Sequence, residues 1–153
     1  MIILFCGIPG SGKSTVSTLL AERLKALGTV QLVNSDRLRG PIYRNLLKLA
    51  APEQRPADFL ILDATFYKRE WREQIKAIAQ PEKTIVVFLE SPLNVALERN
   101  RIRDPKISVR AVHIMYHRME RPEDADLVID TTMINPEAAA ERIFEIISKT
   151  AQR

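Results

Sequence analysis

The sequence predicts an α/β fold in which helices cover both faces of a parallel β-sheet. Two observations lead to this prediction. Short apolar runs alternate with longer amphipathic segments along the 153 residues, and several runs are almost continuous in aliphatic and β-branched side chains. Strands covered on both faces have this composition, because neither face meets water. The length matches one domain, so residues 1–153 are expected to form a single unit.

Five apolar runs are predicted to be the strands of this sheet. They are Ile2–Cys6, Val30–Asn34, Phe59–Asp63, Thr84–Glu90 and Leu127–Asp130. In open parallel sheets, ligands bind in the crevice at the carboxyl ends of the strands. Residues that directly follow these runs are therefore the first candidates for a functional site.

Helices are predicted between the strands. Apolar residues recur at helical spacing from Val16 to Leu27, and Gly28 provides a C-terminal stop. The segment Gly40–Pro56 predicts only one short helix among its prolines. The remaining predicted helices are Lys68–Ala79, Ser91–Arg103 with Ser91 as N-cap and Pro92 at the first helical position, Ser108–Glu120, and a last helix that begins at Pro136.

Composition and charge narrow the classes of function. Cys6 is the only cysteine, so no intrachain disulfide can form, and its apolar neighbours predict a buried thiol. No apolar stretch is long enough to span a bilayer or to form a signal-peptide core, which predicts a cytoplasmic protein with no membrane partner. The formal net charge of +4 and the pI of about 9.4 favour polyanionic partners such as nucleic acid or nucleotide phosphates.

A phosphate-binding motif follows the first predicted strand. Residues Gly7–Ser14 fit the pattern G-x-x-x-x-G-K-S/T and open a helix, which is the context that makes this P-loop motif specific. Lys13 is predicted to reach the β- and γ-phosphates, and the Ser14 hydroxyl to bind Mg²⁺. We therefore predict ATP or GTP with Mg²⁺ as cofactors. The predicted nucleotide contacts are Gly7, Gly10, Ser11, Gly12, Lys13, Ser14 and Thr15.

The second predicted strand is followed by a candidate for acceptor chemistry. Asp36 is expected across from the P-loop, where its carboxylate could take the proton of an attacking hydroxyl. Arg39, three residues further on, is expected on the same helical face and could bind an acceptor phosphate. The alternative is that Ser35 or Asp36 only caps a helix.

An acidic residue also ends the third predicted strand. Asp63 is predicted to orient Mg²⁺ there, together with Ser14. The alternative is a structural role as an N-cap or turn residue.

A cluster of arginines after the fourth strand predicts a lid over residues 99–110. Arg99 and Arg103 are four apart, so they lie on one helical face; one would pack against adenine while the other neutralises the γ-phosphate. The alternative is a solvated basic surface.

Together these residues resemble the kinase domain of phage-type polynucleotide 5′-kinases. The resemblance covers Gly7–Ser14, Asn34–Arg39, Asp63 and Leu97–Arg103. It implies a P-loop kinase fold with a parallel sheet in the order 2-3-1-4-5. It also implies that Lys13 and Ser14 hold ATP–Mg²⁺, that Asp36 is the general base for a 5′-hydroxyl and that Arg39 binds the acceptor phosphate. Arg99 and Arg103 match the two lid arginines.

Other parts of the chain resemble related kinases. The ending Ala125–Thr132 before Pro136 is similar to adenylylsulfate kinases, and Asp63–Arg72 is similar to seryl-tRNA kinases; zeta-toxin-like kinases share the scaffold. The main hypothesis is an ATP-dependent kinase of the 5′-hydroxyl end of RNA or DNA. The alternatives are a kinase of a small metabolite, a nucleotide or an aminoacyl-tRNA, and a nucleotide-dependent ATPase or switch that phosphorylates no acceptor.

Overall fold

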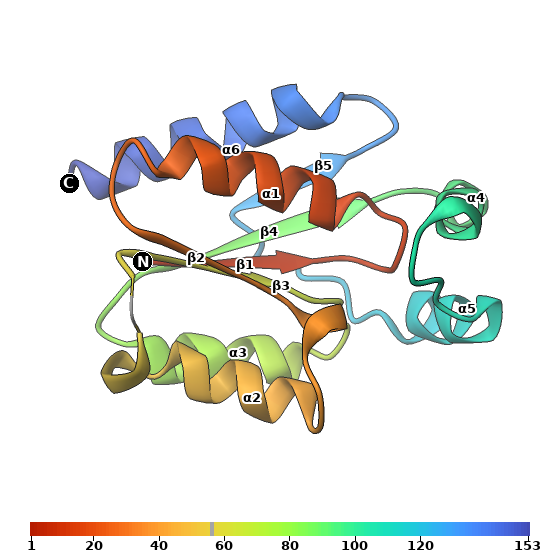
Figure 1. Ribbon diagram of the computed structural model, residues 1–153, viewed down its shortest axis with the longest axis horizontal. Coiled ribbons are helices and arrows are strands. Elements are labelled where there is room, and N and C mark those ends of the chain that lie inside the picture. Colours follow the sequence, from red (N-terminus) through yellow and green to blue (C-terminus); the bar gives the residue numbers. More distant parts are fainter. Residues whose placement is uncertain (56) are drawn as a thin grey trace.

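Five parallel strands form one sheet at the centre of the computed structural model, which describes residues 1–55 and 57–153. Their order is β2-β3-β1-β4-β5 (Figure 1). Pro56, which closes the segment Gly40–Pro56, lies outside the described residues. The five strands agree with the predicted runs: β1 Ile2–Cys6, β2 Val30–Asn34, β3 Phe59–Asp63, β4 Thr84–Glu90 and β5 Leu127–Asp130.

Helices cover both faces of this sheet, as predicted. In Figure 1, α1 (Lys13–Leu24) and α6 (Pro136–Ala151) lie above the sheet, while α2 (Ile42–Ala50) and α3 (Arg69–Ala79) lie below it. Two further helices, α4 (Leu93–Ile102) and α5 (Val109–Arg118), lie beyond the carboxyl ends of the strands. Two short 3₁₀ turns complete the elements, η1 (Ser35–Arg37) and η2 (Pro52–Gln54).

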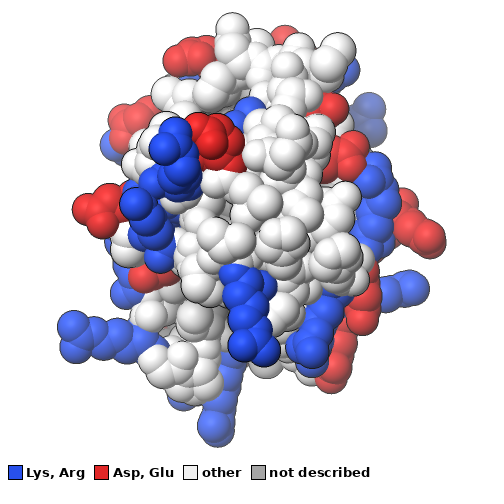
Figure 2. Space-filling view, turned by 90° about the vertical axis from the view of Figure 1, so that its right-hand side faces the viewer, with Lys and Arg blue, Asp and Glu red and all other residues white. Residues whose placement is uncertain are grey.

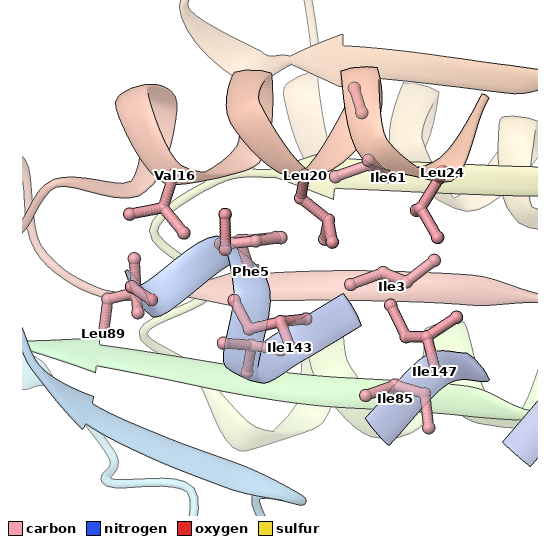
Figure 3. Packing of buried hydrophobic residues seen from close by; sticks show 14 of the residues in the cluster. Ile3, Phe5, Val16, Leu20, Leu24, Ile61, Ile85, Leu89, Ile143 and Ile147 are labelled. Atoms are coloured by element: carbon pink, nitrogen blue, oxygen red, sulfur yellow. The ribbon is translucent and has the colours of Figure 1, made fainter. Parts of the chain in front are cut away.

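The hydrophobic core is divided into two layers by the sheet, because successive side chains of a strand point to opposite faces. Ile3 and Phe5 of β1 point toward α1 and α6, where Figure 3 shows them among Leu20, Ile143 and Ile147. The intervening residues of β1, Ile2, Leu4 and Cys6, contribute to the layer on the α2–α3 side. All five residues of β1 are fully buried, so the strand that leads into the P-loop is held rigidly from both sides.

Several helix boundaries differ from the prediction: α1 ends at Leu24 and not near Leu27, α5 ends at Arg118 and not at Glu120, and α4 differs at both ends. The prediction that Ser91 caps α4 is wrong, because Pro92 occupies the N-cap position and its carbonyl accepts the Ala96 N–H at 3.0 Å. Ser91 Oγ has no hydrogen-bond partner among the described residues. The helix ends at Ile102, so Arg103 follows it in extended backbone.

Within the described part of the chain, none of the helices has the length and apolar character needed to cross a membrane.

Candidate active site

The loop between β1 and α1 packs closely on neighbouring backbone, and this closeness requires glycine. A Cβ atom on Gly10 would lie 2.2 Å from the carbonyl oxygen of Ala96, and the φ angle of Gly10 is +84°. Gly12, at φ +99°, forms the N-cap of α1 and faces the side chain of Thr131. L-residues rarely adopt these backbone angles. The predicted glycine-rich turn is therefore present, and it lies against the start of α4.

The beginning of α1 provides unpaired backbone donors. The first helical hydrogen bond runs from the Val16 N–H to the Gly12 carbonyl at 3.1 Å. The N–H groups of Lys13, Ser14 and Thr15 precede it and have no partner in the helix. Such groups, with the positive end of the helix dipole, form an anion site that suits the phosphates of a nucleotide.

Lys13 places a buried cation at this anion site. Its side chain is only 8% exposed, and Nζ donates to the Ile8 carbonyl at 2.9 Å, which folds the ammonium under the loop. Burial lowers the pKa of Lys13, while the nearby carboxylate of Asp63 opposes this shift. A phosphate group in the loop would favour the charged form in the same way as Asp63 does.

A polar cluster lies beside Lys13, at the carboxyl ends of β2 and β3. Asp63 accepts hydrogen bonds at Oδ2 from Ser14 Oγ at 2.9 Å, from Ser17 Oγ at 3.2 Å and from Asn34 Nδ2 at 3.3 Å. Burial raises the pKa of Asp63, and the charge of Lys13 partly offsets this. A hydroxyl oxygen next to a carboxylate is a suitable donor set for Mg²⁺, which prefers one or two protein oxygens together with substrate phosphates. The predicted metal residues, Ser14 and Asp63, are thus in contact with each other.

Asp36 and Arg103 are 67 residues apart in the sequence, but their side chains form an ion pair through Asp36 Oδ2. Asp36 lies in η1, directly after β2, and Arg103 lies just past the end of α4. The predicted base and the predicted lid arginine therefore meet at the same cavity, and both remain partly accessible.

Arg99 has a different position from the one its role as a lid residue implies. Its guanidinium donates to the Thr131 hydroxyl at 2.7 Å, to the Thr131 carbonyl at 3.2 Å and to the Gly10 carbonyl at 3.3 Å. Because Arg103 is outside the helix, the two arginines do not share one helical face, and that expectation is wrong. Arg99 nevertheless lines the cavity, where it joins α4 to the P-loop.

These groups line one cavity of about 860 Å³. Gly7 and Ser11 are buried and do not line it. The predicted residues that do line it are Gly10, Gly12, Lys13, Ser14, Thr15, Asp36, Asp63, Arg99 and Arg103.

Arg39 is a further predicted site residue that does not line the cavity. The helical turn η1 ends at Arg37, and Leu38 is extended with a ψ angle of 146°, so Arg39 does not continue the helical face of Asp36. The expectation of a shared face is wrong for this reason. Arg39 is exposed, and its carbonyl accepts a hydrogen bond from Asn45 Nδ2 at 2.9 Å.

Three residues of the site were not identified as site residues from the sequence. Ser17 follows Ser14 by three residues, so helical spacing places both hydroxyls on the face toward Asp63. Thr131 directly follows β5, and its hydroxyl donates to the Ser11 carbonyl at 2.8 Å. Asn34 is the last residue of β2. In each case the signal was a polar side chain at a strand end or one helical turn from the motif.

The sheet order, the glycine-rich loop that opens α1, and the buried side chains of Lys13 and Asp63 define a P-loop kinase fold. A family model matches residues 2–122, and the chain belongs to this family, AAA_33, which is described as an AAA domain.

Curated relatives of this chain include kinases. An L-seryl-tRNA(Sec) kinase of Methanococcus maripaludis is 27% identical over 86% of this chain and 60% of the relative. An adenylyl-sulfate kinase of Staphylococcus carnosus is 27% identical over 96% of this chain and 83% of the relative. The bifunctional enzyme NodQ of Azospirillum brasilense is 26% identical over 97% of this chain. The chain spans 60% of the seryl-tRNA kinase and 27% of NodQ.

Solved structures share the fold at low sequence identity. The Mycobacterium tuberculosis APS kinase CysC, in complex with AMPPNP and APS, has a TM-score of 0.76 at 21% identity, with 96% of both chains covered. A gluconokinase of Sinorhizobium meliloti has a TM-score of 0.70 at 18% identity, covering 97% of this chain and 95% of that one. These likenesses confirm the arrangement of strands and helices.

Proposed function

We propose that this protein is an ATP-dependent kinase that transfers the γ-phosphate to a hydroxyl group of a small acceptor. The acceptor is a metabolite or nucleotide, or the aminoacyl group of a tRNA. Relatives named as seryl-tRNA kinase and adenylyl-sulfate kinase support this choice. They favour it over the 5′-hydroxyl of a polynucleotide, which was the main hypothesis from the sequence.

The observation that carries the proposal is the position of Asp36 in the cavity that also contains Lys13 and Ser14. The backbone donors of α1 and the ammonium of Lys13 would bind the phosphates, and Ser14 and Asp63 would hold Mg²⁺. When bound, the metal ion would neutralise charge on the phosphate oxygens. Asp36 would receive the proton of the acceptor hydroxyl, a contribution of about 10²–10⁴-fold in rate.

The size of the cavity supports a small acceptor group. Ligand pockets in proteins are typically about 300–1,000 Å³, and this one is about 860 Å³. A nucleotide would take up much of this volume. The remaining space would suit a small molecule or the end group of a larger one. Arg103, which pairs with Asp36, would limit access to the base from the lid side.

A second candidate function, transfer to the 5′-hydroxyl end of RNA or DNA, is favoured by a group of arginines. Arg37 lines the cavity, and Arg39 and Arg44 are exposed on the segment that follows it. None of the three forms an ion pair with another described residue. Figure 2 shows the face of the molecule at the carboxyl ends of the strands, with Lys and Arg side chains around its margin and acidic side chains between them. Cations in this position suit the phosphates of a nucleic-acid strand.

Transfer of labelled γ-phosphate from ATP–Mg²⁺ would test the proposal. The acceptors are adenylyl sulfate, seryl-tRNA, and short RNA and DNA strands with 5′-hydroxyl ends; 5′-phosphorylated strands serve as controls. Label on adenylyl sulfate or on the seryl group would support the proposal. Label on 5′-hydroxyl strands alone, with affinity that falls steeply as salt rises, would establish the second candidate instead. Release of inorganic phosphate with no labelled acceptor would contradict both.

A further inference from the structure

Asn34, the last residue of β2, makes three hydrogen bonds that join the two halves of the site. Its Nδ2 donates to Ser14 Oγ at 3.0 Å and to Asp63 Oδ2 at 3.3 Å. Its Oδ1 accepts the backbone N–H of Asp36 at 2.9 Å. A single carboxamide therefore contacts both side chains that we assign to Mg²⁺ and the backbone of the residue that we assign as the base.

The chemistry of these partners determines how the carboxamide is oriented. Ser14 and Asp63 present oxygen atoms, whereas Asp36 presents an N–H donor. Only the orientation with Nδ2 toward the oxygens and Oδ1 toward the N–H satisfies all three contacts, because the flipped amide would place oxygen against carboxylate. A carboxylate at this position could accept from Asp36 but could not donate to Asp63. Both ends of an amide are therefore used.

Register in the sheet explains why the contacts form at this point. Asn34 pairs with Asp63 across the parallel ladder between β2 and β3, so the two side chains start from adjacent positions at the same sheet edge. Ser14 follows Lys13 in the first turn of α1, and its hydroxyl reaches the same edge. The backbone turns into η1 directly after Asn34, which brings the Asp36 N–H back to Oδ1.

From this geometry we propose that Asn34 is a positioning residue, which fixes Asp36 relative to the oxygens of Ser14 and Asp63. The proposal rests on the proposed function, because it assigns those oxygens to Mg²⁺ and the carboxylate of Asp36 to proton transfer. Residues that hydrogen-bond to metal ligands typically contribute 10–100-fold to metal affinity or activity. A small displacement of a catalytic group can cost about 10²-fold in rate.

Two substitutions distinguish the positioning of Asp36 relative to Ser14 and Asp63 from simple support of the turn after β2. Asn34→Ser supplies a short hydroxyl that can accept the Asp36 N–H and keep the turn, but it cannot reach both Ser14 and Asp63. Asn34→Ala removes every contact. Asn94, exposed on α4, provides the matched control Asn94→Ala. The first readout is binding of a non-hydrolysable ATP analogue as the Mg²⁺ concentration is varied, which requires no acceptor.

The proposal predicts that Asn34→Ser and Asn34→Ala both need about 10–100-fold more Mg²⁺ for half-maximal binding. Both should also lower kcat by about 10–100-fold, while Asn94→Ala matches the wild type. In an Asp36→Asn background and at saturating Mg²⁺, Asn34→Ala should lower the residual kcat no further, because this substitution also removes the contact with Asp36 and its effect on rate acts through the base. If Asn34→Ser binds Mg²⁺ and turns over like the wild type, Asn34 serves only the turn and the proposal is wrong. If the wild type transfers phosphate to no acceptor while the Asn34 variants still need more Mg²⁺ to bind the ATP analogue, the proposed function alone is overturned.

Discussion

The buried charges of the site, Lys13 and Asp63, lie where a protein interior would ordinarily exclude them. Each is stabilised by the other and by hydrogen bonds, and burial disfavours the charged form of both. Such an arrangement is inefficient as a source of stability. It is useful when a ligand supplies the missing charges, because phosphates complement Lys13 and a cation complements Asp63. The residue-scale electrostatics therefore favour a nucleotide site over a structural ion pair.

Cys6 shows the opposite behaviour, that of an inert buried thiol. Its Sγ lies 3.3 Å from the Thr65 carbonyl oxygen, and burial raises its pKa from 9.0 to about 11. The thiol form is retained in the folded protein as pH rises past 9, whereas the unfolded chain ionises there. At pH 8 we expect native Cys6 to react with iodoacetamide at least about 100-fold more slowly than in the urea-unfolded protein, since the thiolate is the nucleophile. Mass spectrometry measures both rates, and equal rates would contradict the buried position.

The residue scale is also where prediction from sequence was least complete. The P-loop residues follow a fixed spacing, so the loop could be located directly and roles could be predicted for its residues. Arg39 could not be placed correctly, because spacing alone does not show that a 3₁₀ turn ends at Arg37 and that the chain then extends. The contacts of Asn34 and Thr131 depend on which strands are neighbours, and local sequence contains no signal for such pairings.

Among the elements, the P-loop depends on close packing against α4. Gly10→Ala would place a Cβ atom 2.2 Å from the Ala96 carbonyl oxygen in a left-handed conformation. Gly40 has a similar φ angle of +78°, but the nearest heavy atom to its Cβ position is 4.0 Å away. Comparing alanine substitutions at these two glycines therefore distinguishes the effect of backbone strain alone from the effect of strain with a steric clash in the site.

We expect Gly40→Ala to destabilise the protein by about 1–2 kcal/mol, the cost of a left-handed residue, and to leave ATP binding intact. Gly10→Ala should cost more than this and should also abolish ATP binding, because the loop must shift away from α4. Urea denaturation and equilibrium binding of ATP measure the two effects. Normal ATP affinity in Gly10→Ala would show that the loop does not need its contact with α4.

Strands and helices were predicted well because their signals are local. Each strand is a largely apolar run that ends in a polar residue or cysteine, and the bounds of all five agree with the structure. The start of α4 was wrong, since both Ser91 and Pro92 fit the N-terminus of a helix and only the backbone bond from Ala96 to Pro92 decides between them. The order of the strands was inferred from family resemblance and is confirmed.

At the scale of the whole molecule, the site joins separate parts of the chain. The P-loop, η1, the end of β3, the end of α4 and the loop after β5 all contribute to one cavity. A ligand bound there would contact all of these segments, so its binding energy should stabilise the domain as a whole. At a concentration 100 times its dissociation constant, a ligand adds about 2.7 kcal/mol to the free energy of unfolding.

Thermal unfolding with ATP tests this coupling. We expect ATP with Mg²⁺ to raise the Tm of the wild type more than ATP with EDTA does. In Asp63→Asn this difference should largely disappear, while the protein stays folded, because burial already disfavours the charge on Asp63. Glu53→Gln, on an exposed turn remote from the cavity, is the control and should behave like the wild type. An unchanged Mg²⁺ effect in Asp63→Asn would remove Asp63 from the metal site.

The most direct test of the account is phosphate transfer by Asp36→Asn, measured with labelled ATP–Mg²⁺ and the acceptor that the wild type phosphorylates. Loss of the general base predicts a rate about 10²–10⁴-fold lower, with ATP binding nearly unchanged and with Glu53→Gln as active as the wild type. Turnover by Asp36→Asn at the wild-type rate would contradict the assignment of Asp36 as the base, and with it the proposed transfer to a hydroxyl in this cavity.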